Sequence, residues 1–584
     1  MVLRSDAAHP SFWSLAAVLR RGGIDRRTFL RQAAALGIGA GLAGALASAW
    51  SSEGHAASTT ETAPPTGDFD YVVVGAGSAG AVCAARLATS SEARVLVLEA
   101  GCSDDLPEIH DPTRWLAAIG TRAAKVFTTV PQAHTAGRRH VWPRGNVLGG
   151  SSSVNAMIFA RGHRSDFDAW AYAGCTGWSY ADVLPIFRAM EDYSGGADAF
   201  RGTGGPLHVS RPTPDQRHEG AVAFVEAGRA LGFPGNDDFN GAELDGIGFV
   251  DLSISDAGRQ SSAVAFLKPA MARANLTVLT DAPVLDVVVE GGRCTGVRYL
   301  HAGVPRTVRA AIEVIVAAGA LDTPRILMLS GIGPAADLVR LGIEVAADLP
   351  VGLGLQDHVL GAGVNYEARG PVPPSKTNSS EAYLWHRTDS RLLGPDVVTL
   401  HVSIPYATDA FALNHAHGYA ILSGVSRPVS RGSLRLASSD PRDAPLIDPA
   451  YLTEEADRRA FRTATEIACE IGAAAAFDRF RAREVLPGDL RSHREWDDFL
   501  AKSASTFFHP TSTCRMGTGP EAVVDPELRV RGIEGLRVAD ASIMPQVVTT
   551  NTNPASLMIG WRAADLVLGI GSAERRPVVA GPSP

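Results

Sequence analysis

The feature that most constrains this chain is a strand–turn–helix–strand pattern that begins near residue 69. Residues 69–74 are rich in β-branched side chains and predict a buried parallel strand. The sequence Gly-Ala-Gly-Ser-Ala-Gly over residues 75–80 follows directly, and the small residues of 79–88 predict a helix. A second predicted strand, over 94–98, ends at Glu99. This order and spacing predict a Rossmann-type unit that binds a dinucleotide.

Each part of the unit has a physical task. Gly75 permits a tight turn, Gly77 lets the backbone approach a pyrophosphate, and Gly80 lets the helix pack on the strand. The helix N-terminus offers free N–H groups and a positive dipole to the phosphates. Glu99 can accept hydrogen bonds from ribose hydroxyls and would repel a 2′-phosphate, which argues against NADP. The motif does not separate NAD from FAD. The predicted contact residues here are Gly75, Gly77, Ser78, Ala79, Gly80, Glu99 and Ala100.

Further blocks lie downstream of this unit in a fixed order. They cover residues 144–162, 319–334, 507–517, 538–545 and 551–554. The first contains Arg-Gly-Asn-Val-Leu-Gly-Gly-Ser-Ser-Ser-Val-Asn, and the third contains His-Pro-Thr-Ser-Thr-Cys-Arg-Met-Gly. Together with the Rossmann unit, these blocks resemble the glucose–methanol–choline (GMC) oxidoreductase family.

The resemblance runs from about residue 69 to 569 and implies an α/β fold with two discontinuous domains. A Rossmann-type FAD-binding domain, like that of glutathione reductase, is expected to combine with an α+β substrate-binding domain built on an antiparallel sheet. The FAD-binding domain is predicted over 67–160, 255–345 and 505–570, the substrate-binding domain over 161–254 and 346–504, and a flexible tail over 571–584. Alternating patterns predict strands at 398–404 and 419–423, and residues 458–476 predict a helix.

The resemblance also implies where FAD binds. Gly149 and Gly150 are expected to bring backbone N–H groups close to the flavin ring, and the polar residues after them lie where a helix can begin. The alternative is an ordinary glycine turn with an N-cap, and a capping role is also the alternative for Asn155. Some relatives carry a covalently linked histidine where this chain has Val154, so FAD is predicted to be non-covalent. Val284 is expected at the adenine and Asp540 at the ribityl or pyrophosphate part, with a buried capping aspartate as the alternative. The implied contact residues are Arg144, Gly149, Gly150, Ser151, Asn155, Val284, Asp540 and Ala541.

The implied reaction is oxidation of an alcohol by hydride transfer to flavin N5. His509 is the expected base, because imidazole titrates near working pH. Asn553 is expected to pair with it and to stabilise developing alkoxide charge. The alternatives are a structural histidine at 509 and a helix-capping role for Asn553.

Several functions remain open at this level. A flavin-dependent lyase of the hydroxynitrile type and a secreted binding protein without activity use the same scaffold, whereas an NAD-dependent dehydrogenase would explain only the first motif. The electron acceptor is a quinone, another acceptor or oxygen, and dehydrogenase is favoured over oxidase. The alcohol is unresolved among choline, aliphatic, aryl and polyether alcohols, and sugars. Choline recognition would require an aromatic cage and a carboxylate.

The N-terminus has the pattern of an export signal. Residues 25–31 contain paired arginines, and the apolar stretch 33–50 leads to small residues. This pattern predicts a twin-arginine signal peptide over 1–57 and a linker over 58–66, with a transmembrane anchor as the alternative. The protein is therefore expected to use the twin-arginine export machinery and to be periplasmic or secreted, without a stable membrane span after processing.

Charge and cysteine content argue against two classes of binding partner. The net charge is -8 and no long basic run occurs, which argues against nucleic acid. The six cysteines form no CxxC pair or metal-like cluster, so no metal site is predicted.

Overall fold

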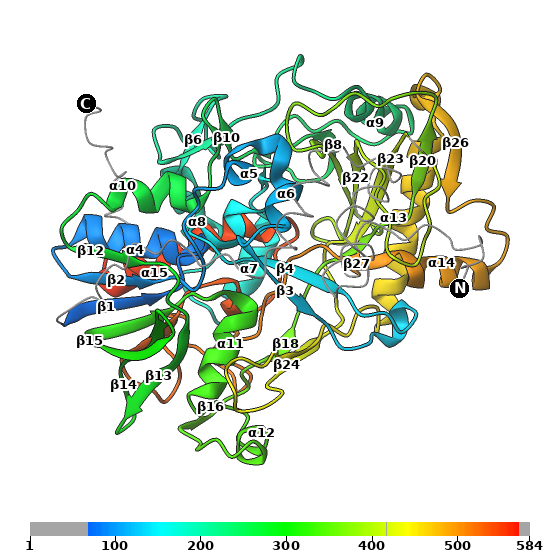
Figure 1. Cartoon of the computed structure of the whole chain (residues 1–584). Coiled ribbons are helices and arrows are strands. Elements are labelled where there is room, and N and C mark those ends of the chain that lie inside the picture. The colour runs from blue at the N-terminus through cyan, green and yellow to red at the C-terminus, as the bar shows by residue number, and fades with distance from the viewer. Residues whose placement is uncertain (1–67, 416, 572–584) are drawn as a thin grey trace, which may run out of the picture.

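The computed structural model describes residues 68–415 and 417–571. The predicted signal peptide and linker lie outside these residues, as does the predicted tail after Gly571, and export stays a prediction from the sequence. Two large sheets organise the described chain and lie on opposite sides of it (Figure 1). This arrangement confirms the predicted α/β fold with an antiparallel second sheet.

The first sheet contains the predicted Rossmann strands. Neighbouring strands follow the order β12–β2–β1–β15–β14–β13 across the sheet, and β28 pairs with β15. β12, β2, β1, β15 and β28 are parallel, whereas β13 and β14 form antiparallel pairs with their neighbours. The bounds are β1 (Phe69–Val74), β2 (Val95–Leu98), β12 (Leu276–Leu279), β13 (Val284–Glu290), β14 (Arg293–His301), β15 (Val304–Val316) and β28 (Leu536–Val538).

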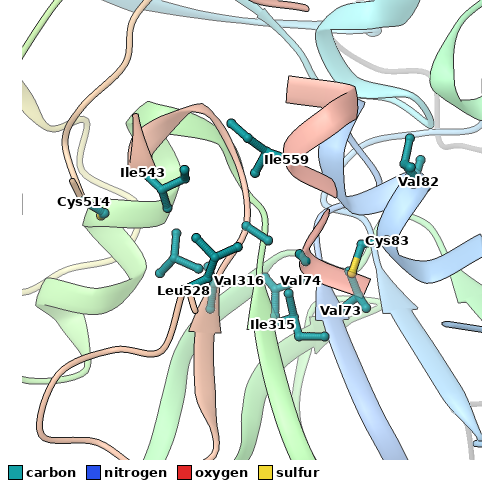
Figure 2. Close-up of a cluster of buried hydrophobic side chains, with 14 of the residues drawn as sticks. Val73, Val74, Val82, Cys83, Ile315, Val316, Cys514, Leu528, Ile543 and Ile559 are labelled. Carbon is teal, nitrogen blue, oxygen red and sulfur yellow. The ribbon is translucent and has the colours of Figure 1, made fainter. Parts of the chain in front are cut away.

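Two helices from opposite ends of the described chain cover this sheet together. α4 (Ser78–Ser90) follows the glycine turn, and α15 (Thr552–Leu568) packs against it. A Cβ at Gly560 of α15 would lie 2.1 Å from the Ala79 carbonyl oxygen, so only glycine permits this approach. Figure 2 shows the buried side chains of both helices over the strands of the sheet. Burial of each such aliphatic side chain stabilises the fold by roughly 1.5–3 kcal/mol. This packing holds α4 on the sheet with its N-terminus at the carboxyl edge of the strands.

The second sheet is antiparallel, in the order β26–β20–β23–β22–β21–β8, with β19 beside β23 and β27 beside β19. Helices α9 (Glu219–Ala230) and α13 (Glu455–Ala473) cover one face. The predicted strands and helix of this region are confirmed, with the helix beginning three residues earlier. The bounds are β8 (Gly246–Phe249), β19 (Val359–Gly361), β20 (Asn365–Ala368), β21 (Ala382–His386), β22 (Val397–Val402), β23 (Gly418–Val425), β26 (Arg481–Leu486) and β27 (Ala504–Thr506).

Shorter elements connect the two sheets. The further helices are α5 (Pro107–His110), α6 (Trp115–Ile119), α7 (Arg164–Tyr172), α8 (Tyr180–Met190), α10 (Lys268–Ala270), α11 (Gly319–Leu329), α12 (Ala335–Arg340) and α14 (His493–Ser503). Small sheets are formed by β3 (Ala124–Thr128) with β4 (Val141–Gly145), β5 (Ile158–Phe159) with β9 (Asp251–Leu252), β6 (Glu191–Tyr193) with β7 (Leu207–Val209), β10 (Ile254–Ser255) with β11 (Gly258–Arg259), β16 (Ile332–Gly333) with β17 (Ala347–Asp348), and β18 (Leu353–Leu355) with β24 (Gly432–Arg435) and β25 (Leu446–Asp448).

None of the helices within residues 68–571 combines the length and the apolar character that crossing a membrane requires. All six cysteines lie in the described chain, and each is a free thiol.

Candidate active site

A cavity of about 420 Å³ is lined by residues of both sheets. Its walls include the carboxyl ends of β1 and β2, the N-terminus of α4, and side chains of β21, β22 and β23. All of the predicted site residues line this cavity except Gly80 and Gly149. Segments that are hundreds of residues apart in the sequence therefore meet at one place.

The glycine turn forms an open cradle at the N-terminus of α4. Gly75 has φ +97°, and a Cβ there would lie 2.6 Å from the Ala317 carbonyl oxygen. A Cβ at Gly77 would meet nothing closer than 3.9 Å and would project into free space. No side chain caps the helix at Gly77, so its first N–H groups remain available to phosphate oxygens. Gly80 has the predicted packing role, since a Cβ there would lie 2.0 Å from the Gly75 carbonyl oxygen.

Gly149 and Gly150 do not offer their own N–H groups to a ligand, and the predicted approach of backbone N–H groups to the flavin stays a prediction. The Gly149 N–H donates to the Ala76 carbonyl and the Gly150 N–H to the Val147 carbonyl, so neither is free for a ligand. Their task is close packing instead, because a Cβ at Gly150 would lie 2.6 Å from the Cα of Gly77. The helix expected after them is only a short 3₁₀ turn, η3 (Gly150–Ser153).

Glu99 ends β2 and faces the cavity, as predicted. One carboxylate oxygen accepts the Ala76 N–H and the other accepts the Gly101 N–H, both at 2.8 Å. Burial raises the pKa of Glu99 to about 7, and these two backbone hydrogen bonds oppose the shift. Each oxygen keeps a second lone pair that can accept a ribose hydroxyl.

Three other predicted polar residues have structural partners. Asp540 accepts hydrogen bonds from Gly319 N–H at 2.9 Å and from Thr323 Oγ1 at 2.6 Å, and it caps the 3₁₀ turn at 541–543. Asn155 accepts from Met157 N–H, and Ser151 Oγ accepts from Gly145 N–H. The capping alternative therefore describes the side-chain contacts of Asp540, although both Asp540 and Asn155 line the cavity.

His509 is held at the cavity wall by a buried carboxylate. The strand β27 ends at Thr506, and Phe508 has φ +65°, which turns the chain at this point. Asp357 accepts the His509 backbone N–H at 2.7 Å and the Thr506 hydroxyl at 2.7 Å, and it also accepts the Tyr451 hydroxyl. Burial raises the pKa of Asp357 to about 6, while these hydrogen bonds oppose the shift. The imidazole position is thus fixed through its own backbone.

A second histidine contacts the ring of His509. His358 Nδ1 lies 2.9 Å from His509 Nδ1, and the two rings are nearly perpendicular at 89°. Burial lowers the pKa of His509 well below its usual value, and the neighbouring His358 and Arg144 lower this pKa further. Burial lowers the pKa of His358 to about 4. Both imidazoles are therefore neutral at neutral pH.

The amide partner of His509 is Asn551 and not Asn553, which corrects the predicted pair. Asn551 Nδ2 lies 3.3 Å from His509 Nε2. Asn551 is the N-cap position of α15, but its side chain makes no capping hydrogen bond and is free to face the histidine. Asn553 instead accepts a hydrogen bond from Ser78 Oγ at 2.7 Å, at the glycine turn. The roles that sequence reasoning missed are those of His358 and Asn551, of which only Asn551 lies in one of the sequence blocks described above, 551–554.

Arg144 places a positive charge in the same wall. Its guanidinium donates to the carbonyl oxygens of Pro143 and Phe508, both at 2.9 Å. Burial lowers the pKa of Arg144 to about 10, which leaves the group charged at neutral pH.

These residues fit a dinucleotide that carries a flavin. The phosphate cradle, Glu99 and Val284 line one part of the cavity, and His509 and Asn551 line another. Gly319 also lines it, and a Cβ there would meet nothing within 4 Å, so this backbone has room for a close ligand. Val154, which is 4% exposed, lines the same cavity and offers no nucleophile.

Comparisons with known proteins agree with this geometry. Two family models described as GMC oxidoreductase match residues 69–360 and 428–560. An oxygen-dependent choline dehydrogenase of Brucella suis biovar 1 (strain 1330) is 39% identical over 532 residues, which is 86% of this chain and 96% of that protein. The protein of the same name from Sinorhizobium fredii is 40% identical, over 86% of this chain and 95% of that protein.

Solved structures show the same similarity. Pyridoxine 4-oxidase from Mesorbium loti has a TM-score of 0.84 and 40% identity, covering 86% of this chain and 100% of that chain. Formate oxidase from Aspergillus oryzae RIB40 has a TM-score of 0.78 and 25% identity, covering 87% and 99%.

Proposed function

Because the chain belongs to the GMC oxidoreductase family, we propose that it is an FAD-dependent alcohol dehydrogenase in which His509 is the base. The resemblance stated from the sequence is thereby confirmed. The observation that carries the proposed mechanism is the 3.3 Å contact between Asn551 Nδ2 and His509 Nε2 at the wall of the cavity that also holds the phosphate cradle.

The two side chains act on the substrate hydroxyl in complementary ways. His509 Nε2 accepts the hydroxyl proton, and the Asn551 amide donates a hydrogen bond to the oxygen as negative charge develops on it. Their mutual contact at 3.3 Å is long for a hydrogen bond, so a substrate oxygen can replace it at little cost. Bound FAD supplies the acceptor for the hydride that leaves the carbinol carbon.

The histidine pair favours the tautomer of His509 that a base requires. Only one of the two Nδ1 atoms can carry the proton in their 2.9 Å contact. Asn551 Nδ2 can only donate, so its contact with His509 Nε2 uses a lone pair on that nitrogen and leaves the His509 proton on Nδ1. His358 Nδ1 is then the acceptor and His509 Nδ1–H the donor. This leaves the lone pair of His509 Nε2 directed to the substrate.

The pH dependence of the reductive step follows from the lowered pKa of His509. A lowered pKa favours the neutral base, so protonation should inactivate the enzyme only well below pH 6.5. Stopped-flow measurement at saturating alcohol should therefore give a rate constant of anaerobic flavin reduction that is flat from about pH 8 to 6.5 and falls at lower pH. A half-maximal rate at or above pH 6.5 would contradict this assignment.

FAD is expected to leave the protein on denaturation, because the side chain of Val154 cannot form a bond to the flavin. Acid precipitation of the holoenzyme should release all yellow colour into the supernatant as FAD, as shown by absorbance and chromatography. Flavin that remains on the washed pellet would show a covalent link at another residue.

The proposed function is tested by an anaerobic panel of aliphatic, aryl and sugar alcohols with the FAD-loaded protein. We expect at least one alcohol to bleach the flavin band and to yield the aldehyde or ketone. Recovery of the band with a quinone faster than with air is expected for a dehydrogenase. Product formation without bleaching would support a lyase instead, and a panel without either would overturn the proposal.

A further inference from the structure

We propose that the substrate is an uncharged alcohol with an apolar body, and that this chain discriminates against choline. This inference rests on the proposed function and concerns the part of the cavity that the second sheet lines. Choline appears in the names of the relatives and carries a permanent positive charge, so it is the natural charged alcohol for the comparison.

The floor of this part is a row of one tyrosine and three leucines across the second sheet. Tyr383 of β21 lies opposite Leu400 of β22, and Leu400 lies opposite Leu422 of β23. Leu360 of β19 is paired with Gly424, two residues after Leu422, and therefore extends the same face. All four side chains line the cavity, and each is at most 3% exposed. Three strand steps give this floor a length of about 14 Å.

The row begins beside the proposed base. β19 also pairs with β27, where Leu360 is opposite Ser505, and the chain reaches His509 four residues later. An alcohol whose hydroxyl lies at His509 consequently places its body over aliphatic side chains. Such a surface stabilises an apolar body through burial.

The carboxylates that line the cavity lie outside the second sheet, and each forms hydrogen bonds or ion pairs with the protein. Among the described residues that line it, the acids are Glu99, Asp322 and Asp540. Asp322 forms ion pairs with Lys125 Nζ at 3.1 Å and with Arg325 Nε at 2.8 Å, while Glu99 and Asp540 accept the backbone hydrogen bonds described above. Asp322 also raises the pKa of Glu99 in addition to burial, which places it on the nucleotide side. The second sheet contributes no acid to the cavity within the described chain.

The cavity wall that holds the base also carries the positive charge of a guanidinium. Arg144 lines the cavity and, within residues 68–571, has no carboxylate at ion-pair distance. Its charge lowers the pKa of His509 beyond the effect of burial, so its potential reaches the reacting hydroxyl. Asp357 is nearby, but it does not line the cavity, and its oxygens accept hydrogen bonds from three groups of the protein. A quaternary ammonium here would be repelled by Arg144, without a carboxylate of the cavity lining to offset that repulsion.

Phe507 beside the base and Tyr383 of the floor do not remove this penalty. Phe507 stacks on His509 at 23°, and Tyr383 stacks on Trp385 at 21°, so each has one ring face covered by a neighbour. The attraction of a cation to a single open aromatic face is smaller than the cost of taking that cation out of water. Recognition of choline would need a carboxylate that this part of the cavity lacks.

The test compares choline with 3,3-dimethylbutan-1-ol, which has the same shape but carbon in place of the charged nitrogen. We expect the neutral alcohol to bind the FAD-loaded protein at least about 100-fold more tightly by calorimetry, and to reduce the flavin with a correspondingly larger second-order rate constant. Equal or tighter binding of choline would overturn the inference, as would binding of neither compound or preferential binding of a hydroxy acid.

Binding and flavin reduction separate the two proposals. Tight binding of the neutral alcohol without flavin reduction contradicts the proposed function but supports the inference. Flavin reduction by choline as fast as by the neutral alcohol supports the proposed function but contradicts the inference.

A matched pair of variants at Leu400 tests the effect of a negative charge on the floor. Leu400→Glu should raise the ratio of choline to neutral-alcohol binding at least about 10-fold relative to Leu400→Gln, which has nearly the same shape without the charge. An unchanged ratio in two folded, FAD-loaded variants would contradict the assignment of this row to the substrate body. The comparison in the unaltered protein stands independently if Leu400→Glu does not fold.

Discussion

Replacing His509 with alanine is expected to lower the rate constant of anaerobic flavin reduction by about 10³-fold while FAD remains bound. The reason is that the Asn551 amide can hold a hydroxyl but cannot take its proton at neutral pH. The residues that bind the dinucleotide are on other elements, so FAD retention should not depend on the imidazole. Stopped-flow absorbance gives the rate, and the flavin-to-protein absorbance ratio gives the occupancy.

The matched control for this variant is His134→Ala, which removes an exposed imidazole away from the cavity. It should reduce flavin at the rate of the unaltered protein. The backbone N–H of residue 509 still donates to Asp357 in the alanine variant, so the local turn is expected to persist. A reduction rate within a few-fold of the unaltered protein, at full occupancy, would show that another group takes the proton.

The nucleotide half of the site could be predicted because its constraints are local. The order of strand, glycine turn, helix and acid fixes where β1, α4 and Glu99 must lie relative to each other. The glycine at 80 has its predicted packing role for the same reason. The bond of the Gly149 N–H to the Ala76 carbonyl was not predictable, because it joins two loops that are distant in the sequence, whereas the Gly150 N–H bonds locally to the Val147 carbonyl.

The substrate half of the site could not be predicted, because its geometry depends on how distant segments pack in the tertiary structure. Which face of β22 carries Leu400 toward the cavity is decided by the register with β21 and β23, which connects segments separated by long loops. The contact between His358 and His509 joins positions 151 residues apart. The sequence pattern contains these residues without indicating their partners.

The sequence predicted Asn553 as the partner of His509 where the structure has Asn551, and the difference has a geometric cause. Both asparagines stand at the start of α15, where each residue turns the side-chain direction by about 100°. Two positions apart, the side chains point in nearly opposite directions, so one faces His509 and the other faces Ser78. The sequence motif gives the helix start but not which of its sides is next to the histidine.

This geometry leads to opposite expectations for the two asparagines. Asn551→Ala should lower the rate constant of flavin reduction by about 10²-fold, because it removes a donor aimed at the developing alkoxide. The measured loss should appear in the rate constant at saturating alcohol more than in alcohol binding, since the charge on oxygen exists only as the reaction proceeds. FAD occupancy should remain unchanged.

Asn553→Ala removes the acceptor of the Ser78 hydroxyl at the phosphate cradle. It should weaken FAD binding by about fivefold, which corresponds to the loss of one hydrogen bond, and leave the reduction rate of the FAD-saturated protein nearly unchanged. Fluorescence titration of the apoprotein with FAD measures the first effect, and stopped-flow reduction at excess FAD measures the second. If Asn553→Ala lost the 10²-fold in rate and Asn551→Ala did not, the reacting hydroxyl would lie on the cradle side of the helix and the proposed pair with His509 would be wrong.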